Sequence, residues 1–99
     1  MDGAFQSADL RKHSPSYSES ADAYRAVICT EGNHRVIVCK DDRQWIIQRS
    51  RNRRMECVWE GVSYVTTQSA LTRLWHGLGC AHAPELDALP NMFRKGATV

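Results

Sequence analysis

The residues of this chain best suited to chemistry are arginines, and they are concentrated in one segment. Between residues 35 and 54 the sequence holds seven basic and two acidic residues, a net charge of +5, whereas the rest of the 99-residue chain carries −3. Arginine binds phosphates and guanine edges through paired hydrogen bonds, and a tryptophan beside it can stack on a base. The segment therefore predicts a surface that faces a polyanion.

A predicted β-strand over residues 43–49 decides which of these side chains are displayed. Alternation puts Trp45, Ile47, Arg49 and Arg51 on one face and the intervening residues on the other. If Ile46 points to the core, Trp45 and the arginines face solvent. If Trp45 and Ile47 are core, as their greater apolarity favours, the arginines form a solvated rim. The candidate nucleic-acid contacts are Arg35, Arg43, Trp45, Arg49, Arg51, Arg53 and Arg54.

Other kinds of site lack the patterns that they need. His76, Cys80 and His82 lie close in sequence, but there is no Cys-x-x-Cys pair. A zinc site would have to take its fourth ligand from a distant residue, namely His34, Cys39 or Cys57. No nucleophile signature, glycine-rich phosphate loop or pair of spaced carboxylates is present. We therefore expect no metal, no cofactor and no catalytic residue, and interpret the chain as a non-enzymatic binding protein.

The elements that position the arginines follow from periodicity and turn residues. Strands are predicted over residues 35–40, 43–49 and 56–65, the last bent or bulged near Gly61. Residues 24–30 fit a further strand or a short helix. Asp41-Asp42 predicts a two-residue reversal, and residues 50–54 predict a basic loop.

An amphipathic helix follows the strands. Thr66-Thr67 predicts its N-cap, and Gly79 predicts its end. Pro84 predicts a short second helix, stopped by Pro90. The fold class is α+β: a three- or four-stranded antiparallel meander with one helix packed on one face. The apolar stripe of the first helix consists of Ala70, Leu71, Leu74, Trp75 and Leu78. It predicts a core contact, with a homodimer through the Trp75 face as the alternative.

The domain boundaries and the compartment follow from composition. Residues 1–21 are polar, serine-rich and aperiodic, which predicts a disordered tail. Residues 22–93 are predicted to form one domain, with a frayed end at 94–99. No long apolar run or signal-peptide h-region is present, so we expect a cytoplasmic protein with no membrane partner. The four cysteines, at positions 29, 39, 57 and 80, are then expected to be buried free thiols.

Two resemblances bear on function. The layout Arg-Gln-Trp-Ile-Ile-Gln-Arg, Val-Trp-Glu-Gly and Thr-Thr-Gln-Ser-Ala-Leu resembles three-stranded-sheet-plus-helix DNA-binding domains, over residues 35–78. Such domains occur in plant ethylene-response factors and in the arm-binding regions of tyrosine recombinases, where the sheet face enters the major groove. The resemblance implies contacts from Arg35, Arg43, Trp45 and Arg49, with Trp59 as a further candidate.

The second resemblance spans most of the chain that we expect to be ordered. The strings Arg-Val-Ile-Val-Cys-Lys, Gln-Trp-Ile-Ile-Gln-Arg and Tyr-Val-Thr-Thr…Ala-Leu-Thr-Arg-Leu are similar to a family of short, uncharacterised bacterial proteins that are common on mobile elements. That family implies no activity.

The sequence thus predicts a nucleic-acid-associated or regulatory binding protein that uses a basic, tryptophan-bearing hairpin. The alternative is an accessory protein of a phage or mobile element that inhibits or adapts a host protein by direct contact.

Overall fold

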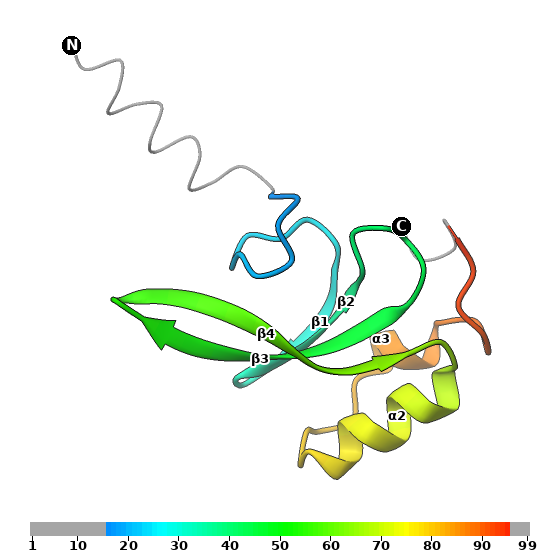
Figure 1. Ribbon diagram of the computed structural model, residues 1–99. Helices are drawn as coiled ribbons and strands as arrows, with labels where there is room; N and C mark the ends of the chain where they lie inside the picture. Colours follow the sequence, from blue (N-terminus) through cyan, green and yellow to red (C-terminus); the bar gives the residue numbers. More distant parts are fainter. Residues whose placement is uncertain (1–15, 96–99) are drawn as a thin grey trace.

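The computed structural model describes residues 16–95. They form a four-stranded antiparallel sheet in the order β1-β2-β3-β4, followed by two helices. Figure 1 shows α2 on one side of the sheet and residues 16–24 on the other. The predicted α+β class is confirmed. The elements are β1 (Val27–Glu31), β2 (His34–Val38), β3 (Trp45–Arg53), β4 (Glu56–Val65), α2 (Gln68–Gly77) and α3 (Pro84–Asp87).

The centre of the sheet is buried on both faces. Trp45 packs with Leu71 and Trp75 beneath the helices, while Ile46 packs with Tyr24 on the opposite face. Strands that are covered on both sides read as continuous apolar runs, as Val-Ile-Val in β2 and Trp-Ile-Ile in β3 do. Trp45 is 0% exposed. The arrangement in which Trp45 faces solvent is therefore wrong.

The second face is covered by residues 16–24, which we call the strap. The Trp59 amide donates a 2.9 Å hydrogen bond to the Ser20 carbonyl at the outer edge of β4, and Ala21 forms an antiparallel bridge with Val58. At the other end of the strap, the Tyr24 hydroxyl donates to the Val38 carbonyl at 2.7 Å. The prediction of a disordered tail is wrong for residues 16–21. Residues 1–15 of that tail, and residues 96–99 of the predicted frayed end, lie outside the described residues.

The helix α2 begins and ends where its capping residues predict. Thr67 is the N-cap, and its hydroxyl accepts a 3.2 Å hydrogen bond from the Ala70 amide. At the other end, Gly79 has φ +84°. Its amide donates to the His76 carbonyl, while the Cys80 amide donates to the Trp75 carbonyl. These two bonds form a Schellman motif, which satisfies the last carbonyls of the helix.

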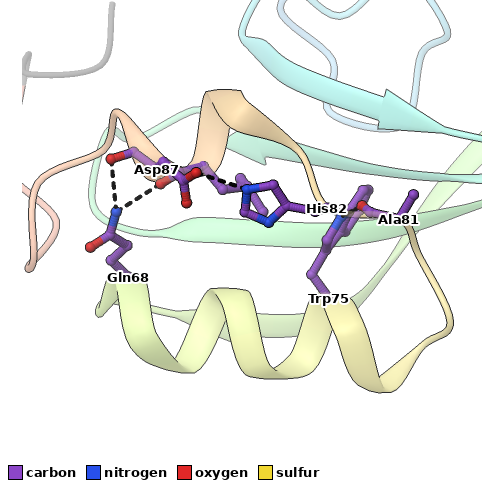
Figure 2. A network of polar contacts seen from close by, with 6 residues as sticks. Gln68, Trp75, Ala81, His82 and Asp87 are labelled. Atoms are coloured by element: carbon purple, nitrogen blue, oxygen red, sulfur yellow. Dashed lines mark hydrogen bonds and ion pairs between the residues drawn. The ribbon is translucent and has the colours of Figure 1, made fainter.

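Polar contacts hold the segment after α2 against the helix (Figure 2). The Gln68 side-chain amide donates to the carbonyls of Leu86 and Asp87, and the Trp75 indole donates to the Ala81 carbonyl at 2.9 Å. Trp75 is 0% exposed. It belongs to the core of this chain, as the apolar stripe predicts, so the Trp75 ring is not available to a second copy of the chain. None of the helices within residues 16–95 has the length and apolarity needed to cross a bilayer.

The four cysteines are free thiols in two different environments. Cys29, Cys39 and Cys80 are buried, whereas Cys57 is exposed, so the expectation of burial is wrong for Cys57. Burial raises the pKa of the Cys29 thiol to about 11. Desolvation, together with the neighbouring Asp22, also raises the pKa of Cys57.

Thiol labelling should separate these environments. At about pH 8 we expect a disulfide reagent to modify one thiol of the folded protein quickly and three slowly, because only the thiolate of an accessible cysteine attacks. In denaturant all four should react. The variant Cys57→Ser should lose the fast phase. A second fast thiol, or a fast phase that survives in Cys57→Ser, would contradict this assignment.

Candidate functional site

The β3–β4 hairpin extends well beyond the rest of the sheet. The strand β2 pairs with β3 only between Trp45 and Arg49, whereas β3 and β4 remain paired out to Arg53 and Glu56. We call residues 49–60 the arm; in Figure 1 it projects to the left, away from α3. The predicted basic loop over residues 50–54 is wrong, because β3 continues to Arg53. The strap reaches β4 at Val58 and Trp59, and past these residues β3 and β4 form a two-stranded ribbon, which adds little stability by itself.

The arm displays arginines along one face. Arg49, Arg51 and Arg53 share the face on which Trp45 and Ile47 enter the core, but they lie beyond the core cluster and are exposed. Arg51 makes a 3.1 Å ion pair with Glu60. Both side chains are largely exposed, so the pair contributes at most about 1 kcal/mol. Among residues 16–95, no carboxylate lies within ion-pair distance of Arg49, Arg53 or Arg54.

The net charge of the arm is smaller than the +5 that residues 35–54 carry in the sequence. The strand β4 brings Glu56 opposite Arg53 and Glu60 opposite Arg49. With four arginines and these two glutamates, the arm carries a net charge of +2. Half of this excess lies at the tip, where Arg53, Arg54 and Glu56 line a pocket of about 360 Å³.

Arg35 is not part of this surface. It is 2% exposed and lies beneath the strap, with its guanidinium carbon 4.3 Å from the centre of the Trp59 ring. Its Nε donates to the Gln48 side-chain oxygen at 2.7 Å. The other two nitrogens donate to three carbonyls at 2.9–3.1 Å, those of Glu19, Ala21 and Asp22.

These contacts use the guanidinium as a structural centre. Burial lowers the pKa of Arg35, and the neighbouring Asp22 opposes that shift; an arginine nevertheless stays protonated in a protein. Trp59 is 6% exposed and donates from its indole to Asp22 at 2.9 Å. The prediction that Arg35 and Trp59 contact nucleic acid is therefore wrong.

The remaining candidates separate into two places. Arg43 is exposed, but it lies in the loop before β3, at the end of that strand opposite the tip of the arm. At about 3.3 Å per strand residue, roughly 30 Å separate it from Arg53. The structure thus brings together Arg49, Arg51, Arg53 and Arg54, and leaves Arg35, Arg43 and Trp45 outside the group.

The residues considered for zinc do not form a site in the described part of the chain. Within residues 16–95, no group of three or more His, Cys, Asp or Glu side chains is arranged to hold a metal ion. Cys80 is buried. The rings of His76 and His82 lie 5.8 Å apart, and His82 Nε2 contacts an oxygen of Asp87 at 2.8 Å (Figure 2).

The tip of the arm is a two-residue turn with unusual residues. Arg54 and Met55 have φ values of +51° and +67°, as a type I′ turn requires. Most residues with a Cβ atom resist this region by about 1–2 kcal/mol each; Asn-Gly is the common choice because asparagine bonds locally to the backbone and glycine has no Cβ atom. Met55 is also 100% exposed. Sequence reasoning missed Met55, and no turn signal marks it, because Arg-Met is not among the residue pairs that favour a two-residue hairpin turn.

Replacing the turn should stabilise the protein. The double variant Arg54→Asn, Met55→Gly should raise the free energy of unfolding by about 1 kcal/mol, since it relieves the left-handed strain, while glycine's greater freedom in the unfolded chain offsets part of the gain. Urea denaturation measures the difference. Arg54→Ala, Met55→Ala is the control, because both alanines keep the Cβ atom without asparagine's local hydrogen bond and should give no such gain. An Arg54→Asn, Met55→Gly variant no more stable than the parent would refute the claim that the left-handed conformations of Arg54 and Met55 lower stability.

Comparison of the chain with models of protein families, with curated proteins and with solved structures finds no match. The two resemblances drawn from the sequence therefore stay predictions.

Proposed function

We propose that this protein is a non-enzymatic nucleic-acid-binding protein that uses the arm as its contact surface. The observation that carries the proposal is the exposure of four arginines on the β3–β4 hairpin, three of them beyond the part of β3 that pairs with β2. Three of the four, Arg49, Arg53 and Arg54, have no carboxylate within ion-pair distance among residues 16–95. Their hydrogen-bond donors are available to phosphates.

The shape of the arm supports the same function. Two-stranded β-ribbons contact duplex DNA through its major or its minor groove. The arginines that alternate along β3 would follow one wall of a groove, while the turn reaches furthest from the body. The proposal places the protein in the cytoplasm, where nucleic acid is accessible and a thiol such as Cys57 stays reduced.

A matched pair of variants tests the proposal. Arg51→Ser, Arg53→Ser, Arg54→Ser removes three charges from the arm, and Arg43→Ser, Arg73→Ser, Arg94→Ser removes three exposed charges from elsewhere. Surface changes of this kind alter stability by about 0.5 kcal/mol or less each, so both variants should fold. Binding to duplex and single-stranded DNA is measured by fluorescence anisotropy at low salt.

We expect the arm variant to lose roughly tenfold in affinity for each phosphate contact removed at ~0.1 M salt, and the control variant to keep most of its affinity. Equal losses in both variants would show that net charge, rather than the arm, governs binding. Absence of binding by the parent protein would contradict the proposal and favour the alternative function, contact with a host protein.

A further inference from the structure

The tip of the arm carries a feature that phosphate binding does not explain. Met55 is 100% exposed, so its side chain buries nothing within the described chain. It also occupies a left-handed conformation, at φ +67°, that glycine adopts without strain. The side chain thus lowers the stability of the fold and exposes an apolar group to water. Residues kept under such strain are concentrated at working sites.

The surroundings of Met55 indicate what it meets. Arg53 and Arg54 precede it in the sequence. Asn52 lies in the next pair of the ribbon, opposite Cys57. An apolar anchor for a protein pocket is expected within an apolar or mixed patch, whereas this one lies among charged groups, the guanidiniums of Arg53 and Arg54 and the carboxylate of Glu56, with a net charge of +1. Arginine is drawn to the negative potential of a narrow minor groove, and methionine is among the side chains that separate stacked base pairs from that groove.

We infer that Met55 is a wedge that inserts between adjacent base pairs of duplex DNA from the minor groove and kinks the duplex, while Arg53 and Arg54 hold the flanking phosphates. This inference rests on the proposed function of the arm and assigns it a duplex ligand. The step forms and breaks no covalent bond. Stacking between two base pairs is exchanged for contacts of each pair with the methionine side chain, and the bend brings more of the arm against the backbone.

The experiment uses the full chain and a duplex of about 20 base pairs with several TA steps, which kink most readily. Adenines in these steps are replaced by 2-aminopurine, whose fluorescence rises when it unstacks. A donor and an acceptor dye at the two ends of a second duplex report bending. The variants are Met55→Gly, which removes the wedge and suits the turn, and Met55→Leu, which keeps an apolar wedge.

We expect the parent protein and Met55→Leu to raise the 2-aminopurine fluorescence and to shorten the distance between the duplex ends. Met55→Gly should lose both signals while its affinity stays within about tenfold of the parent's, because the arginines remain and the unstacking cost is no longer incurred. Since Met55→Gly relieves strain at the turn, a folding defect would not account for that loss.

The outcomes separate this inference from the function on which it rests. If the parent protein binds the duplex but neither unstacks nor bends it, or if Met55→Gly gives the parent's signals, the wedge is refuted and the arm remains a binding surface. If the parent protein binds neither the duplex nor single-stranded DNA, both proposals fail. Binding confined to single strands would likewise refute the wedge.

Discussion

Replacing Arg35 with leucine should lower the free energy of unfolding by about 3–5 kcal/mol, because three carbonyl groups and the Gln48 side chain lose their partner at once. Those carbonyls belong to the strap, at Glu19, Ala21 and Asp22. Leucine supplies no donor, and the strap must either bury the carbonyls unpaired or leave the sheet. The Trp59 ring would also lose the guanidinium that lies over it.

Urea denaturation gives the size of this effect, and two further variants show its origin. Arg35→Lys keeps the charge but has no planar fork, so it should recover only part of the loss. Arg43→Leu, at an exposed position, should change stability by about 0.5 kcal/mol or less. An Arg35→Leu protein as stable as the parent would show that the guanidinium contacts contribute nothing net.

Removing the first six residues of the strap, 16–21, should lower stability by a similar amount. We compare a chain that starts at residue 16 with one that starts at residue 22, so that the difference isolates residues 16–21. The shorter chain loses the partner of the Trp59 amide and two carbonyls that Arg35 binds. We expect its thermal midpoint to lie about 10 °C or more below that of the longer chain.

The stability losses caused by Arg35→Leu and by deletion of residues 16–21 should not be additive. Once residues 16–21 are absent, Arg35 is exposed to water and makes fewer hydrogen bonds. The substitution Arg35→Leu should therefore lower the free energy of unfolding much less in the chain that starts at residue 22. Calorimetry of the four proteins closes this cycle. Equal midpoints for the two truncated parents would show that residues 16–21 do not stabilise the sheet, and full additivity would show that they act independently of Arg35.

The local elements of this fold were predictable from the sequence because their signals are local. The strand β4 runs from Glu56 to Val65, as predicted, and its register shift against β3 falls beside Gly61. The cap at Thr67 and the Schellman ending at Gly79 also lie within one turn of the helix that they limit. Such features depend on neighbours in sequence.

The strap was missed because distant residues decide its structure. Residues 16–21 are polar and aperiodic, and the groups that hold them are the side chains of Arg35 and Gln48, more than ten positions away. The same distance explains why the sequence predicts an exposed Arg35: a cation in a basic segment is typical of a surface, and its acceptors lie far away in the chain. A buried arginine is recognised only when its acceptors are known, and here most of them are backbone carbonyls.

The sequence predicts which arginines belong to the candidate site but does not predict the ribbon that carries them. The arginines at 49, 51, 53 and 54 were identified by composition, but composition does not show that β3 continues through them. Pairing with β4 converts the predicted loop into a ribbon and sets Glu56 and Glu60 among the arginines. The alternation of β3 then places Trp45 in the core and the arginines beyond it.

The most direct test of the arm as a nucleic-acid contact is the dependence of duplex binding on salt concentration. Each phosphate contact contributes about −0.9 to the slope of log K against log salt concentration. We expect a slope of roughly −3 to −4 for the parent protein, from four arginines, and a slope nearer −1 for Arg51→Ser, Arg53→Ser, Arg54→Ser. A parent slope near zero, or a slope that the three substitutions leave unchanged, would contradict the proposed function.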